Sequence, residues 1–170
     1  MSIRKTFILL VSHGIAVAVG FAVGIYTLPI IVAADAPSAS AVSALANKAQ
    51  YSAEFRRELK DSDALHWGEG QVFVGRDSIS FMGRLAPGPD YMLYLWPTFV
   101  ETETAFNRLK SKMVVVGSVK TFDNFLVEIP PGIEPSDYTT VIVWCESFGE
   151  FITSAKYQNN DSLLKGDATL

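Results

Sequence analysis

The stretch "TTVIVWCESFGEFITSAKYQ", residues 139–158, decides the fold of this chain. β-Branched and aromatic residues fill both halves of it, and Ser147-Phe148-Gly149 separates the halves, so the pattern predicts a hairpin of two strands. Side chains alternate between the faces of a strand, and both faces of the first one are apolar: Val141, Val143 and Cys145 on one, Ile142 and Trp144 on the other. Such a strand is expected at the centre of a sheet, covered on both sides.

Five further runs of the same character precede this hairpin, at residues 70–75, 78–82, 91–97, 113–119 and 124–129. Clusters rich in Gly, Pro and Asp separate them, most clearly "APGPD" (86–90) and "PPGIEPSD" (130–137). About seven strands at this spacing predict an all-β domain, a compact antiparallel β-sandwich or barrel. The polar stretch 102–112 is predicted to be an insertion or loop with one helical turn.

Residues 6–34 contain no charged side chain. A helix of about twenty apolar residues crosses a hydrocarbon core of about 30 Å, so the segment is predicted to be a transmembrane anchor that follows a cytoplasmic tail of residues 1–5. The alternative is a cleaved secretory signal that begins with Arg4 and Lys5 and is cut after Ala34. The apolar part of such a signal spans about 7–15 residues, which favours the anchor.

The charges that flank the apolar segment predict its orientation. Arg4 and Lys5 precede it and Asp35 follows it, so the positive-inside rule puts the rest of the chain on the extracytoplasmic side, periplasmic or extracellular, of a single-pass cell-membrane protein. Without those two, 12 of the 14 basic residues remain against 18 acidic ones, with no basic stripe. This balance argues against nucleic acid as a partner and leaves the membrane as the expected one.

Residues 35–63 are rich in Ala and Ser and then become charged. Apolar residues recur there at helical spacing, which predicts a partly helical spacer with one apolar face: Val42, Leu45, Ala49, Phe55 and Leu59. That face is expected to pack on the β domain or to pair with a second copy, as in a homodimer. The β domain is then assigned to residues 64–158, and residues 159–170 to a flexible C-terminal tail.

Cys145 is the only cysteine, which excludes an internal disulfide. His66 is the only histidine after the apolar segment, so a copper site with two histidines and a cysteine is also excluded, as are a Cys/His zinc site and covalent haem attachment through C-x-x-C-H. Four interpretations stay open for the thiol: inert core packing, a thiolate that binds haem iron, a redox-active group, and an intermolecular disulfide.

Four stretches carry a resemblance to a known family: "HWGEGQVFVG" (66–75), "GPDYMLYLWP" (88–97), "GSVKTFDNFLVEIP" (117–130) and "YTTVIVWCESFGEFITSAKY" (138–157). Their order resembles the DM-thirteen domain family, an exported module that also occurs beside DOMON domains. The resemblance implies an all-β electron-transfer module whose cysteine is a redox or haem-linked group. On this sequence that role falls on Cys145, with Trp144 and Phe148 as its pocket or packing neighbours.

His66 is a candidate second haem ligand or proton carrier beside the thiol; the alternative is an edge-strand histidine with its tip in water. The sequence contains no G-x-S-x-G, H-E-x-x-H or phosphate-loop motif, which favours a carrier or binding module over an enzyme. The first hypothesis is therefore electron transfer or thiol redox chemistry through Cys145 with a redox partner protein. The second is a structural or adhesive module in which the cysteine is buried in the core.

Overall fold

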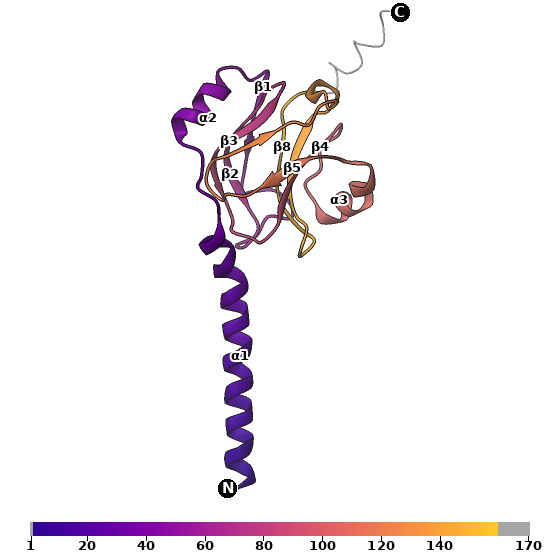
Figure 1. The fold of residues 1–170 in the computed structure, drawn as a ribbon. Coiled ribbons are helices and arrows are strands. Elements are labelled where there is room, and N and C mark those ends of the chain that lie inside the picture. Colours follow the sequence, from indigo (N-terminus) through magenta and orange to yellow (C-terminus); the bar gives the residue numbers. More distant parts are fainter. Residues whose placement is uncertain (1, 160–170) are drawn as a thin grey trace, which may run out of the picture.

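The computed structural model describes residues 2–159, in which a long N-terminal helix carries a β domain at its C-terminal end (Figure 1). The N-terminal elements are the helices α1 (Ile3–Val32) and α2 (Ala39–Ala46), followed by the strands β1 (Tyr51–Phe55), β2 (Gly68–Val74), β3 (Ser78–Leu85) and β4 (Tyr91–Trp96). The helix α3 (Glu103–Leu109) and the 3-10 turn η1 (Lys110–Lys112) precede β5 (Val114–Val119) and β6 (Phe125–Glu128). A second 3-10 turn, η2 (Pro135–Asp137), leads to β7 (Thr140–Cys145) and β8 (Glu150–Lys156).

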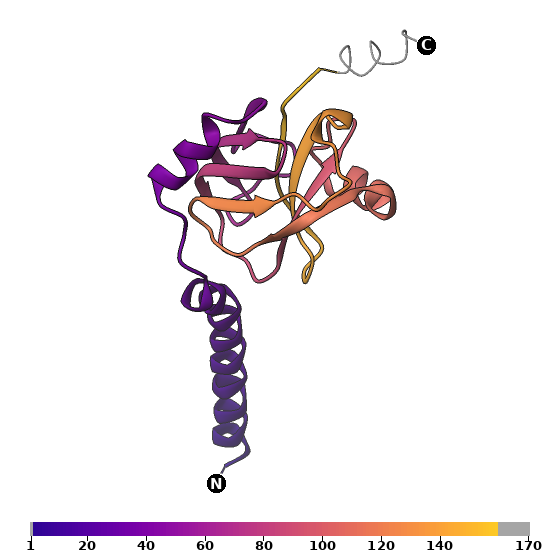
Figure 2. The same cartoon turned by 45° about the horizontal axis from the view of Figure 1, so that its top comes forward.

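The eight strands form two antiparallel sheets. The first sheet has the order β1-β2-β3-β6 and the second β5-β4-β7-β8, and the sheets also touch at both sides, where β5 meets β6 and β1 meets β8 (Figure 2). The prediction of an all-β antiparallel domain is confirmed, and each of the seven predicted runs forms one of the strands β2 to β8. β7 lies between β4 and β8 with all six residues buried, as its two apolar faces predict.

The eighth strand corrects the prediction for residues 35–63. Only Ala39–Ala46 is helical there, with the Ser38 side chain accepting a hydrogen bond from the Ala41 N–H at 3.2 Å. Tyr51–Phe55 instead pairs with β2 as an edge strand of the first sheet, and Phe55 is fully buried between the sheets. The single helical face from Val42 to Leu59 is therefore wrong, because pairing with β2 and burial of Phe55 override the helical spacing.

Residues 102–112 form more than the predicted loop with one helical turn. The Thr102 side chain accepts a hydrogen bond from the Ala105 N–H at 3.2 Å and caps α3, and η1 extends it to Lys112. Phe106 of α3 is fully buried on the outer face of the second sheet. The prediction of a loop overlooked this packing, because only a few apolar residues of the segment, Phe106 with Ala105 and Leu109, hold the helix on the sheet.

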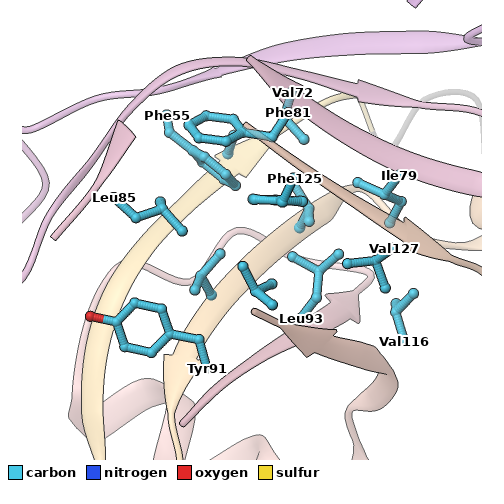
Figure 3. Packing of buried hydrophobic residues seen from close by; sticks show 14 of the residues in the cluster. Phe55, Val72, Ile79, Phe81, Leu85, Tyr91, Leu93, Val116, Phe125 and Val127 are labelled. Carbon is cyan, nitrogen blue, oxygen red and sulfur yellow. The ribbon is translucent and has the colours of Figure 1, made fainter. Parts of the chain in front are cut away.

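The main core fills the space between the two sheets (Figure 3). Phe55, Phe81 and Phe125 form a row in it, with ring centroids 5.3 and 4.9 Å apart. A second cluster covers the outer face of the second sheet beneath α3, namely Leu59, Tyr94, Val100, Phe106, Met113, Ile142, Trp144 and Phe151. The second sheet is thus buried on both faces.

One end of the domain faces the last turns of α1. Tyr91 at the start of β4 pairs with both Val119 at the end of β5 and Cys145 at the end of β7. Lys120, the residue after Val119, accepts a hydrogen bond through its carbonyl from the Ala34 N–H at 3.2 Å. Ala34 lies two residues after the end of α1. We call this end of the domain the helix-proximal rim. The predicted flexible tail lies, from residue 160 on, outside the described residues.

Candidate functional site

Cys145 is the last residue of β7, at the helix-proximal rim. It pairs with Tyr91 of β4 and Glu150 of β8 and is a free thiol. Only 2% of its surface is exposed, and its side chain belongs to the core between the sheets. The thiol is therefore shielded from solvent in this structure, although it lies at the end of its strand.

The turn that covers this end of β7 runs from Glu146 to Gly149. Gly149 has φ +72°, a left-handed conformation that favours glycine, and its N–H donates to the Cys145 carbonyl at 3.0 Å. Asp90, just before β4, holds the other side: its carbonyl accepts from the Glu146 N–H at 2.8 Å, and its carboxylate lies 3.2 Å from Ser147 Oγ. A few hydrogen bonds thus fix the turn beside the sulfur.

Two opposing effects act on the thiol. Burial raises the pKa of Cys145, while backbone N–H groups of Phe148, Asp90 and Ser147 lower it and the Asp90 carboxylate raises it again; the net pKa is raised. The group is accordingly a protonated thiol at neutral pH. The three N–H groups nevertheless act in the direction that favours a thiolate.

Trp144 lies on the opposite face of β7 and is fully buried. Its ring stacks on Phe106 of α3 with centroids 4.0 Å apart and planes 13° apart. Next to it, Glu146 accepts hydrogen bonds from both the Tyr94 hydroxyl and the Lys110 ammonium group. The members of this polar group come from three separate segments, and no signal in the sequence connects them.

The structure separates the two predicted neighbours of the thiol. Trp144 points away from it, into the cluster beneath α3. Phe148 is beside the sulfur only through its backbone N–H, and its side chain is 52% exposed. Trp144 points away because consecutive residues of a strand face opposite sides, whereas the exposure of Phe148 depends on the turn rather than on the W-C-x-x-F spacing.

His66 lies in the loop before β2, where Asp63 holds it. Its Nδ1 is 3.1 Å from Asp63 Oδ2, and its backbone N–H donates to Asp63 Oδ1 at 2.7 Å. The imidazole thus has a carboxylate partner within its own loop. No hydrogen bond connects it with Cys145 among the described residues.

A haem does not fit the residues around the thiol. An axial thiolate needs open space in front of the sulfur, whereas Cys145 is packed among core side chains such as Tyr91 and Val143. His66, the candidate second ligand, is engaged with Asp63. Within residues 2–159, no group of three or more His, Cys, Asp or Glu side chains is arranged to hold a metal ion.

A scan against protein-family models matches residues 55–157 with the family described as electron transfer DM13. The match covers more than half of the chain. The chain belongs to the DM13 family. The DM13 match runs from the last residue of β1 to just beyond β8 and contains Cys145, Trp144 and His66. It confirms the resemblance found in the sequence. Comparisons with curated proteins and with solved structures find no match.

Proposed function

We propose that this DM13 domain is an electron-transfer module, held at the outer surface of a membrane by α1, and that Cys145 is the group that changes redox state. The length and composition of α1 support the membrane anchor, because its 30 residues are numerous and apolar enough to cross a bilayer. The family description supports electron transfer. The residue assignment rests on the surroundings of the sulfur.

The observation that carries this assignment is the position of Cys145 directly before a short turn. Backbone N–H groups of Asp90, Ser147 and Phe148 lower the pKa of its thiol and so oppose the effect of burial. When the turn moves, the sulfur gains access to solvent or a partner, and any of these donors that stays in place stabilises the thiolate. A thiol in the middle of β7 would become accessible only if the sheet came apart.

The single sulfur restricts the chemistry. The Cys145 thiolate can attack a disulfide of a partner protein: a new S–S bond forms between Cys145 and one partner sulfur, and the partner's S–S bond breaks. The released partner sulfur takes up the proton that the Cys145 thiol gave up. The partner is thereby half reduced. A thiol of a third molecule, a donor protein, then attacks the Cys145 sulfur of the mixed disulfide: a new S–S bond forms between the donor and Cys145, and the partner's second sulfur leaves and takes up the donor's proton, which completes the two-electron reduction of the partner.

A second candidate function is a structural or adhesive binding module with an inert cysteine. The burial of Cys145 and its raised pKa favour this alternative, because reactive cysteines have lowered pKa values and some exposure. The two functions differ in one measurable respect. In the redox function the thiol becomes accessible by local opening of the turn, and in the structural function only by unfolding of the domain.

The experiment measures the alkylation rate of Cys145 in the detergent-solubilised full chain, with Gly149→Ala and Gly132→Ala as a matched pair. Both glycines have positive φ, +72° and +90°, and an added Cβ at either has no heavy atom closer than 3.9 Å. Each substitution costs about 1–2 kcal/mol of backbone strain. If the turn opens locally, Gly149→Ala raises the rate about 5- to 30-fold and Gly132→Ala leaves it unchanged. Equal increases in both variants would refute the redox assignment.

A further inference from the structure

The last turns of α1 contact the domain on one side: Ile25 and Thr27 are half-buried there and Pro29 is buried, whereas the preceding turns are exposed all round. Residues 3–24 are exposed along their length, and Pro29 is buried. A cavity of about 300 Å³ lies at this junction, lined by Pro29 and Val32 of α1 and by Tyr91 and Phe122 of the rim, among others. The domain therefore meets the helix one or two turns before the helix ends.

This change in exposure coincides with the thickness of a bilayer. From Thr6, after the basic residues Arg4 and Lys5, about twenty residues at about 1.5 Å each cover the 30 Å of hydrocarbon. The outer hydrocarbon boundary then falls near Ile25 and Tyr26. Tyrosine is enriched at this level in membrane proteins, and Tyr26 is 47% exposed. The first half-buried positions of α1, Ile25 and Thr27, thus fall at the depth where the headgroup layer begins.

The helix-proximal rim is consequently at the level of the lipid headgroups. The turn between β7 and β8 reaches down to the level of the last turns of α1 in both views (Figures 1 and 2). At its tip, Phe148 exposes 52% of its surface. The rim and its flanks also carry charges of both signs, including Lys120, Arg84, Asp90 and Asp123, all exposed, which suits a zwitterionic headgroup layer.

We infer that the helix-proximal rim rests on the membrane, with the Phe148 side chain inserted into the interfacial layer of the outer leaflet. An aromatic side chain loses exposed apolar area there while its backbone remains at the polar surface. The inference rests on the membrane anchor of the proposed function. It adds that the turn over Cys145 faces lipid, so that a partner reaches the thiol along the membrane plane rather than from bulk solvent.

The test uses the full chain in nanodiscs of phosphatidylcholine, with single cysteines introduced in a Cys145→Ala background and labelled with an environment-sensitive fluorophore. Phe148→Cys reports on the rim. Phe99→Cys is the matched control, an aromatic residue of similar exposure (40%) that follows β4 at the opposite end of the domain. Phe21→Cys, 69% exposed on α1, reports on the anchor itself. Lipids with a nitroxide in the headgroup serve as the quencher.

We expect blue-shifted emission and at least twofold quenching at position 148, and solvent-like emission without quenching at position 99. If the label at position 148 behaves like that at position 99 while the label at position 21 is blue-shifted, the inference is overturned and the anchor stands. If the label at position 21 is also solvent-exposed, the inference about the rim and the proposed membrane anchor are both refuted. Should the Cys145→Ala background not fold, Phe148→Trp in the parent chain replaces the label. The readout is then the fraction of tryptophan fluorescence that nitroxide lipid quenches, compared between this variant and the parent chain.

Discussion

Replacing Phe106 by alanine tests whether α3 is an integral part of the domain. Phe106 is fully buried, stacks on Trp144 at 4.0 Å and meets Tyr94 edge-on at 5.1 Å. Removing a buried phenylalanine side chain costs about 3–5 kcal/mol, which includes the transfer of the ring to water and the cavity it leaves. The two aromatic pairs account for about 0.5–1.5 kcal/mol each of that total. The Phe106→Ala variant should therefore lose a large part of the stability of a domain of this size.

The assay is guanidinium unfolding of the full chain in a non-ionic detergent, followed by near-ultraviolet circular dichroism and tryptophan emission. The native emission of Phe106→Ala should also shift to the red, since Trp144 loses its cover. Phe148→Ala is the matched control: it removes the same group from a site with 52% exposure and should cost less than about 0.5 kcal/mol.

A loss below about 1 kcal/mol for Phe106→Ala would refute the reasoning. It would mean that α3 does not pack on the second sheet and that residues 102–112 are the loose insertion predicted from the sequence. A loss equal to that of Phe148→Ala would show, in addition, that Trp144 is not covered from this side.

Two further predictions concern the thiol and its surroundings. Burial raises the pKa values of Cys145, Tyr91 and Tyr157, so the folded state holds these protons more tightly than the unfolded state. Their contribution to stability is complete below the unfolded pKa values, about 8.5 for Cys and 10 for Tyr, and declines at higher pH. The guanidinium midpoint should thus fall from about pH 8.5 upward, and in Cys145→Ala only from about pH 10; identical pH profiles would contradict this. Tyr94→Phe removes the hydrogen bond to Glu146 and should cost about 1–2 kcal/mol in the same unfolding assay, most of which should vanish in a Glu146→Ala background, where the acceptor is absent.

The strands could be predicted from the sequence because their signal is local. In β7 the side chains on both faces of the strand are apolar, so its position between two other strands follows from the pattern alone. β1 has five residues, within the range of four to eight of the other strands, but Phe55 continues an apolar helical spacing that starts at Val42. Its strand character depends on pairing with β2, a contact between segments that the spacing does not reveal. For α3 a local signal did exist: Thr102 is a capping residue, and Phe106 and Leu109 follow at helical spacing.

The candidate site was predictable only in part, for a related reason. The sequence identified Cys145 as the single thiol, but its exposure depends on the turn of residues 146–149 and on Asp90, which is 55 positions earlier in the chain. The exposed position of Phe148 likewise depends on this turn. The spacing W-C-x-x-F describes order along the chain. The exposure of Cys145 and of Phe148, in contrast, depends on how the turn folds back on β4.

Burial of the thiol and a redox role are compatible if opening of the turn requires less free energy than unfolding of the domain. Segments held by few hydrogen bonds open locally at a cost far below that of global unfolding. The turn beside Cys145 is such a segment, since its backbone is fixed mainly through Gly149 and through Asp90. In the closed state the protonated thiol resists adventitious oxidation, because the thiolate is the reactive species. If the rim rests on the membrane, lipid also binds the Phe148 side chain that moves with the turn. A partner would then reach the opened thiol along the membrane plane, and transfer would be confined to partners that are themselves at the membrane.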